Sequence, residues 1–243
     1  MKAIILCAGN TARLPFSPKG CASALLPIKG KPIIEYIVNK LQAVNGLSEI
    51  IVVSNNRFYE QFQQWADNYV SSWPLTIVNT ERKNTACPGA IADLVSVLKT
   101  RRVDDDILVI GGDNLFSFML DEFVDFARNC YPQNVIGAYS LNGKLKPKKY
   151  GLLKLDETGQ VIDFCEKPPV LNGLRLASIC IYFFPKEKLD RLYEYQGQAP
   201  KTHTIGSYIE WLSRKEGVKG YEFEGSWFDI ADDDTYTEAV CTF

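Results

Sequence analysis

The sequence predicts an α/β fold of the Rossmann-like kind, with three α/β/α layers, a mixed and mostly parallel sheet, and a strand-rich lobe in the C-terminal half. Short β-rich runs alternate with helix-like stretches in the first half, which is typical of a parallel sheet. After about residue 134, extended segments predominate, separated by turns rich in Gly, Pro and Lys. No linker or low-complexity tract separates the two halves. We therefore expect one domain over residues 1–243, made of the halves 1–133 and 134–243.

The individual elements follow from the spacing of apolar residues. Ile33, Ile37 and Leu41 recur at helical spacing, and Pro32 suits the first turn, so a helix is expected over 32–44. Further helices are expected at 58–69, 88–99, 120–128 and 205–216. Strands are expected at 2–7, 49–54, 75–79, 107–110, 135–140, 150–156, 161–166 and 178–184.

The composition indicates a folded globular protein with a small partner. Of 243 residues, 46% are hydrophobic and 23% are charged, and the formal net charge of −2 provides no broad positive field for nucleic acid or anionic lipid. Seven cysteines without C-x-x-C pairs fit a reducing compartment, and Cys7, Cys165 and Cys180 lie in apolar runs, where we expect small buried core residues. The apolar run 3–8 is too short for a signal peptide or a membrane span. We expect a cytoplasmic protein that binds neither nucleic acid nor membranes; a homo-oligomer is compatible with this composition.

The first expected strand leads directly into a small-residue loop that suits phosphate binding. Ala8 and Gly9 let the backbone approach a ligand closely, and Arg13 adds a forked cation that matches phosphate oxygens. Because Gly9 is the only glycine, the loop is neither a G-x-G-x-x-G dinucleotide motif nor a Walker A loop. An ordinary turn with a surface arginine explains this segment as well as a phosphate site does.

A second candidate site follows the apolar run 107–110. Gly111, Gly112 and Asp113 end this strand, which places a carboxylate at the C-terminal edge of the sheet, where ligands bind in such folds. Mg²⁺ needs only one or two carboxylates together with substrate phosphates. A Gly-Asp-Asn turn without a function is the alternative interpretation.

Together these segments resemble the signature of the sugar-1-phosphate nucleotidyltransferases. The N-terminal part of the resemblance rests on Ile4-Ile5-Leu6-Cys7-Ala8-Gly9-x-x-x-Arg13-Leu14 and on Ala24-Leu25-Leu26-Pro27-Ile28-x-Gly30-Lys31-Pro32-Ile33-Ile34-Glu35-Tyr36. It continues with the Gly-Asp element at Asp113, with Tyr150-Gly151, with Glu166-Lys167-Pro168 and with Gly225-Ser226-Trp227-Phe228-Asp229. The resemblance covers residues 2–240, and the glucose-1-phosphate thymidylyltransferases and uridylyltransferases are the most similar members.

The resemblance implies a Mg²⁺-dependent enzyme that joins a nucleoside triphosphate to a sugar 1-phosphate and releases pyrophosphate. It implies that Asp113 and Asp229 bind the metal and that Arg13 and Asp113 are catalytic. The nucleotide site that it implies comprises Leu6, Ala8, Gly9, Asn10, Thr11, Arg13, Pro88, Gly89, Gly112 and Asp113. The acceptor site that it implies comprises Tyr150, Gly151, Glu166, Lys167 and Ser178. The halves 1–133 and 134–243 are thus expected to bind nucleotide and acceptor respectively.

Two positions depart from the family pattern. Thr11 stands where the family usually has a second glycine, and Ser23 stands where it has a phosphate-binding lysine. Lys19 is the candidate to supply the missing catalytic charge, because a lysine acts as a flexible point charge; a solvated loop lysine is the alternative. The base-reading segment 85–92 lacks the family's glutamine, so the preferred nucleotide stays open.

Two features near the C-terminus are interpreted structurally. The only histidine, His203, lies near an expected helix start and is interpreted as a surface or capping neighbour rather than a catalyst. The acidic run 232–234 is interpreted as the first turn of a closing helix, where acids suit the helix dipole.

The expected reaction needs no general base. An acceptor phosphate is already anionic near neutral pH and can attack the α-phosphorus in line, so positioning and charge neutralisation suffice. One alternative is a cytidylyltransferase that acts on phosphocholine or another alcohol phosphate. Another is a degenerate homologue that binds nucleotide or sugar phosphate without catalysis, which Thr11 and Ser23 favour. An NAD-dependent dehydrogenase is a more distant alternative.

Overall fold

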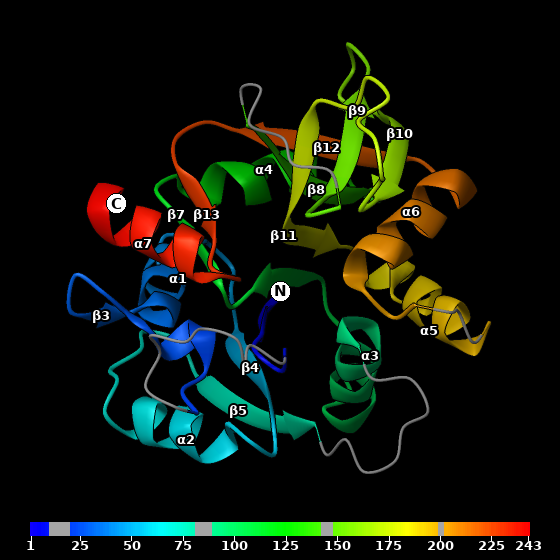
Figure 1. Ribbon diagram of the computed structural model, residues 1–243. Helices are drawn as coiled ribbons and strands as arrows, with labels where there is room; N and C mark the ends of the chain where they lie inside the picture. Colours follow the sequence, from blue (N-terminus) through cyan, green and yellow to red (C-terminus); the bar gives the residue numbers. More distant parts are fainter. Residues whose placement is uncertain (10–19, 81–88, 142–147, 199–201) are drawn as a thin grey trace.

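The computed structural model describes residues 1–9, 20–80, 89–141, 148–198 and 202–243, which form helices around a nine-stranded sheet (Figure 1). The strands lie in the order β10-β9-β11-β6-β1-β4-β5, and β8 and β12 continue from β11. They are β1 (Lys2–Leu6), β4 (Glu49–Asn55), β5 (Leu75–Thr80), β6 (Ile107–Gly111), β8 (Asn134–Ser140), β9 (Gly151–Leu155), β10 (Val161–Glu166), β11 (Leu176–Phe184) and β12 (Val218–Phe223).

The sheet changes character between the two halves of the chain. Strands β5, β4, β1 and β6 are parallel neighbours, and β11 then runs antiparallel to β6, β8 and β9. The prediction of a mixed α/β sheet is confirmed, and the predicted strands agree with the structure to within two residues. Strand β12, which pairs in parallel with β8, was not predicted.

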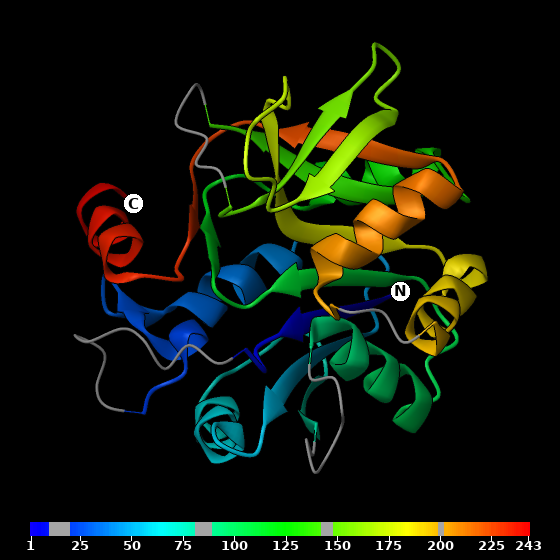
Figure 2. The ribbon, with the colours of Figure 1, turned by 45° about the vertical axis from the view of Figure 1, so that its right-hand side comes forward.

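Helices cover both faces of the sheet, as the three-layer prediction requires (Figures 1 and 2). One face carries α1 (Ile33–Leu41), α2 (Tyr59–Asp67) and α4 (Asp121–Asn129), and the other carries α3 (Ala90–Thr100), α5 (Asp190–Gly197) and α6 (Ile205–Lys215). Alternate residues of β1 serve the two sides, since Ala3 and Ile5 pack under α1 while Ile4 packs under α3. Helix α5 was not predicted.

A small antiparallel pair brings the C-terminal segment to the sheet. Strand β7 (Asn114–Phe116) pairs with β13 (Trp227–Asp229), with Asp229 opposite Asn114. The pair is anchored in the core, because the Trp227 Nε1–H donates to Asn114 Oδ1 at 2.9 Å and the Asn114 Nδ2–H donates to the Ile179 carbonyl at 2.8 Å. This pairing carries a residue from near the end of the chain to the C-terminal edge of β6.

The chain then enters α7 (Asp233–Thr242), which lies beside α1 in Figure 1. Asp232 is its N-cap, and Oδ1 of Asp232 accepts from the Thr235 N–H at 2.8 Å. The prediction that the acidic run opens a closing helix is confirmed.

Short elements complete the description: β2 (Pro27–Ile28) pairs with β3 (Lys31–Pro32), and 3₁₀ turns occur at Ser23–Leu25 and Lys186–Lys188. No helix within the described ranges has the length and apolarity that a membrane span requires.

Candidate active site

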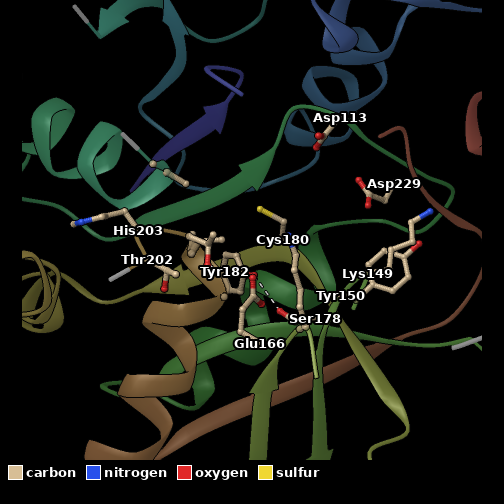
Figure 3. Close-up of a pocket in the computed structure, with 17 residues that line it drawn as sticks. Asp113, Lys149, Tyr150, Glu166, Ser178, Cys180, Tyr182, Thr202, His203 and Asp229 are labelled. Atoms are coloured by element: carbon tan, nitrogen blue, oxygen red, sulfur yellow. Dashed lines mark hydrogen bonds between the residues drawn. The ribbon is translucent and has the colours of Figure 1, made fainter. Parts of the chain in front are cut away.

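A cavity of about 630 Å³ lies at the C-terminal edge of the parallel strands and takes its lining from both halves of the chain (Figure 3). All of the predicted metal-binding and acceptor residues meet there. The predicted residues in its wall are Gly89, Asp113, Tyr150, Gly151, Glu166, Lys167, Ser178 and Asp229. The wall residues that the sequence analysis did not assign are Ala90, Lys149, Cys180, Tyr182, Thr202, His203, Thr204, Ile205 and Gly206.

Asp113 and Asp229 face the same part of this cavity (Figure 3). The backbone holds them together, since the Ile230 N–H donates to the Asp113 carbonyl at 3.0 Å. Burial and, to a smaller extent, the nearby charge of Asp229 together raise the pKa of Asp113 to about 7. Burial also raises the pKa of Asp229, against the lowering effect of Lys149. Two carboxylates that disfavour each other's ionisation are suited to a cation.

The donor set matches the requirements of Mg²⁺. The ion prefers oxygen ligands and is usually held by one or two carboxylates plus substrate phosphates, and Asp113 and Asp229 supply two. Among the residues described, no group of three or more His, Cys, Asp or Glu side chains could hold a metal by itself. A metal at this pair would therefore need ligand oxygens from a substrate or from water.

Lys149 lines the cavity near Asp229. Its Nζ forms an ion pair with Asp232 at 3.2 Å and lies 5.4 Å from the ring centroid of Tyr150. The ring of Tyr150 packs in turn against Trp227, with 5.1 Å between centroids. Tyr150 directly precedes β9 and packs against Trp227 of β13. Lys149 contributes a cation to the cavity wall. No motif marks Lys149 in the sequence, apart from its position before Tyr150-Gly151.

Glu166 is the last residue of β10, Lys167 follows it, and both line the same cavity as the acid pair. Burial raises the pKa of Glu166, while Lys167 and the hydroxyl of Thr204 act to lower it. Lys167 has a left-handed backbone (φ 48°), and its N–H donates to the Tyr150 carbonyl at 3.1 Å. This turn at the end of the strand directs two consecutive side chains to the cavity wall.

Four predicted nucleotide residues that the structure describes lie near the end of β1 and of the neighbouring strand β6. Leu6 pairs with Gly111 across the two central strands, and the Gly112 N–H donates to the Leu6 carbonyl at 2.9 Å. The Ala8 carbonyl accepts from Asn55 Nδ2 at 3.0 Å. Leu6, Ala8, Gly9 and Gly112 thus lie at the same sheet edge as Asp113, but outside the cavity wall. Asn10, Thr11, Arg13, Lys19 and Pro88 lie outside the described residues.

Gly112 is required by close packing. A Cβ at this position would clash with Cys7 Sγ and would lie 3.1 Å from the Leu6 carbonyl oxygen. We expect Gly112→Ala to lower the free energy of unfolding by about 2 kcal/mol, and the double variant with Cys7→Ala to recover part of that loss. Denaturant unfolding measures both. Gly9→Ala is the control, because a Cβ there meets nothing within 4 Å; equal losses at Gly9 and Gly112 would contradict this account.

Two wall residues differ from their sequence interpretation. His203 precedes the N-cap of α6, as expected for a capping neighbour, but it is only 8% exposed, so the prediction of a surface position is wrong. Its ring points away from Asp113 and Asp229 in Figure 3, and the absence of a catalytic role stays a prediction. Cys180 was interpreted as a core residue, yet it lines the cavity in a left-handed conformation (φ 54°). Burial raises the pKa of its thiol, which disfavours the reactive thiolate.

The sequence is similar to a known protein family and to several curated relatives. The family model described as "Nucleotidyl transferase" matches residues 2–243. The bifunctional protein GlmU of Methanocaldococcus jannaschii is 26% identical over 95% of this chain and 51% of its own length. The bifunctional sugar-1-phosphate nucleotidylyltransferase/acetyltransferase of Sulfurisphaera tokodaii is 27% identical over 95% of this chain and 52% of its own. This chain therefore spans about half the length of these curated relatives.

Solved structures support the fold independently of sequence. A putative glucose-1-phosphate thymidylyltransferase from Bacillus anthracis, in complex with a sucrose, superposes with a TM-score of 0.79 at 20% identity, covering 99% of this chain and 94% of that one. A UDP-glucose pyrophosphorylase complexed with UDP-glucose superposes with a TM-score of 0.80 at 18% identity, covering 99% and 97%. At these identities the likeness establishes the shared fold.

Proposed function

Because the chain belongs to the nucleotidyl transferase family, we propose that it condenses a nucleoside triphosphate with a sugar 1-phosphate to give a nucleoside diphosphate sugar and pyrophosphate. One observation carries this proposal: the acid pair Asp113 and Asp229 lines a single cavity together with Glu166 and Lys167. The cavity volume of about 630 Å³ lies within the range of small-molecule sites. A cytoplasmic location, where nucleoside triphosphates are available, is part of the proposal.

The acid pair would hold Mg²⁺. When bound, the ion supplies neutralisation of the charge on the reacting phosphates. The protein's own contribution is to keep both carboxylates at one place through the β7–β13 pairing and the Ile230 N–H bond. Burial raises the pKa values of both carboxyls, so a bound cation would favour their ionised forms by neutralising their charge.

The acceptor would lie between Lys167 and Glu166. The ammonium of Lys167 would pair with the acceptor phosphate, and the carboxylate of Glu166 would accept hydrogen bonds from sugar hydroxyls. An acceptor held at both ends presents its phosphate oxygen to the α-phosphorus of the nucleotide, and the attack needs only alignment. Arg13 and Lys19 are the proposed cations for the leaving pyrophosphate.

The test measures pyrophosphate release by the purified protein with Mg²⁺. Each of four nucleoside triphosphates is combined in turn, as a grid, with several sugar 1-phosphates and with phosphocholine. Release with a sugar 1-phosphate supports the proposal and names both substrates. Release with phosphocholine alone would establish the alcohol-phosphate cytidylyltransferase instead. Silence throughout the grid, with nucleotide binding retained in calorimetry, would contradict transfer and favour a binding protein without catalysis.

A further inference from the structure

The first turn of α6 packs directly against the carboxylate of Glu166. A Cβ at Gly206 would lie 2.5 Å from Cδ and 2.9 Å from Oε1 of Glu166, distances that real Cβ atoms do not adopt. The hydroxyl of Thr204, the N-cap of α6, donates to Glu166 Oε1 at 3.2 Å. The carboxylate therefore occupies the space that any larger side chain at position 206 would need.

Helix α6 also holds the main chain of Glu166. The Glu166 N–H donates to Glu210 Oε2 at 3.1 Å, and Glu210 is itself ion-paired with Arg214 one turn further along the helix. Thr204 is fixed by its capping role, since its Oγ1 accepts from the Ser207 N–H at 3.1 Å. Both the backbone and the side chain of Glu166 are thus oriented by residues of one helix.

The segment that leads into α6 also contacts the nucleotide half of the chain, at the start of α3. A Cβ at Gly89, which precedes α3, would lie 2.5 Å from the Cβ of His203 and 2.5 Å from its carbonyl oxygen. That carbonyl accepts from the Ile91 N–H at 3.2 Å. The segment 202–206 therefore spans from the start of α3 to Glu166, and all five of its residues line the cavity. Figure 3 shows Thr202 and His203 at the margin of the cavity that faces α3.

We infer that the segment 202–206 positions the acceptor-binding carboxylate, with Gly206 and Thr204 as positioning residues that set the place of Glu166 relative to the nucleotide half. The inference rests on the proposed function, since Glu166 matters to transfer only if an acceptor binds there. A carboxylate held from two sides accepts hydrogen bonds only along fixed directions, which discriminates between hydroxyl configurations of the acceptor. Gly206 would then contribute to sugar selectivity without touching the sugar.

Gly206→Ala, compared with Gly197→Ala, tests this role in catalysis. Displacement of Glu166 should raise the KM for the sugar 1-phosphate about tenfold and leave kcat and the KM for the nucleotide nearly unchanged. The ratio of kcat/KM between two epimeric hexose 1-phosphates should fall toward one. Gly197→Ala should match the wild type, because a Cβ there meets nothing within 4 Å. An unchanged acceptor KM and epimer ratio in Gly206→Ala would overturn the inference.

A second measurement needs no activity. Gly206→Ala should lower the midpoint of thermal unfolding by several degrees, because the added Cβ overpacks the site against Glu166. Adding Glu166→Asp, which retracts the carboxylate by one methylene, should recover part of that loss, whereas the equally long Glu166→Gln should recover none. If Glu166→Asp and Glu166→Gln changed the unfolding midpoint of Gly206→Ala equally, the close packing of Gly206 against the carboxylate would be contradicted. Because this readout is independent of transfer, it separates a failure of the positioning role from a failure of the proposed function.

The hydroxyl of Thr204 provides an independent pair of variants should Gly206→Ala not fold. Thr204→Val removes the hydrogen bond to Glu166, while Thr204→Ser keeps it. We expect the valine variant to raise the acceptor KM several-fold and the serine variant to remain near the wild type. A valine variant with an unchanged acceptor KM would overturn the role assigned to Thr204.

Discussion

Asp113→Asn is expected to reduce nucleotidyl transfer by about a thousandfold while it stabilises the metal-free protein at alkaline pH. Activity is lost because an amide is a weak metal ligand and cannot replace a carboxylate beside Asp229. Stability is gained because Asp113 is buried near Asp229, so its ionised form is unfavourable in the folded state. The two effects have opposite signs, as expected for a functional residue that the fold does not need.

The stability gain expected for Asp113→Asn depends on pH because the pKa of Asp113 is raised in the folded protein. The carboxyl of Asp113 titrates at about 7 in the folded protein, above its ordinary value of 3.8. Its contribution to stability is therefore fully present below about pH 4 and is lost as the pH rises through 7. We expect Asp113→Asn to raise the free energy of unfolding on the order of 2 kcal/mol near pH 8 and by much less near pH 5, since the cavity is open to water.

Denaturant unfolding in a metal chelator at these two pH values measures the effect, with pyrophosphate release measured in parallel. Asp234→Asn is the matched control, because Asp234 is an exposed acid in the first turn of α7, away from the cavity wall. A stability gain of equal size at both pH values, or transfer retained in Asp113→Asn, would contradict the assignment of Asp113.

Lys167→Gln is expected to lower kcat/KM for the acceptor about thirtyfold, which corresponds to about 2 kcal/mol for a lost charge-assisted hydrogen bond. Lys167 lines the cavity wall and forms no ion pair with any other residue that the structure describes. Its ammonium is therefore available to an acceptor phosphate without first breaking an ion pair. The fixed bond between its N–H and the Tyr150 carbonyl keeps the backbone in place when the side chain is changed.

Steady-state kinetics against the acceptor at constant ionic strength provide the measurement. Lys154→Gln removes the same charge from an exposed position on β9, outside the cavity wall, and serves as the control. Equal losses in the two lysine variants would indicate a general electrostatic effect rather than a phosphate contact at Lys167. A raised KM for the nucleotide, with an unchanged KM for the acceptor, would indicate that Lys167 contacts the nucleotide and would contradict its role at the acceptor phosphate.

The parts of this site that could be predicted from the sequence are those with local signals. The apolar run before Gly111-Gly112-Asp113 placed Asp113 at a sheet edge, and the structure has it there. Asp229 was proposed only through the family resemblance, since it lies far along the chain and reaches Asp113 through the β7–β13 pairing. Nothing in the local pattern of either segment indicates that pairing.

The site residues that were not predicted from the sequence owe their positions to contacts between segments that are distant in the chain. Gly206 and Thr204 carry no motif, and their relation to Glu166 arises from how α6 packs against β10. Lys149 is one of several lysines between residues 144 and 149 of the sequence, and its place at the cavity wall and its ion pair with the distant Asp232 are known only from the structure. Strand β12 (Val218–Phe223) was also missed, and its place in the sheet comes from its parallel pairing with the distant strand β8.

The most direct test of the central claim is the fate of oxygen in a sugar 1-phosphate whose phosphate carries ¹⁸O. The acceptor phosphate is proposed to attack the α-phosphorus while its own phosphorus–oxygen bonds remain intact. Mass spectrometry of the products, with the substrates identified by the grid, should then find all of the label in the nucleoside diphosphate sugar and none in pyrophosphate. Label absent from the nucleotide product, with nucleoside monophosphate and pyrophosphate formed instead, would show that water is the nucleophile and would contradict the account.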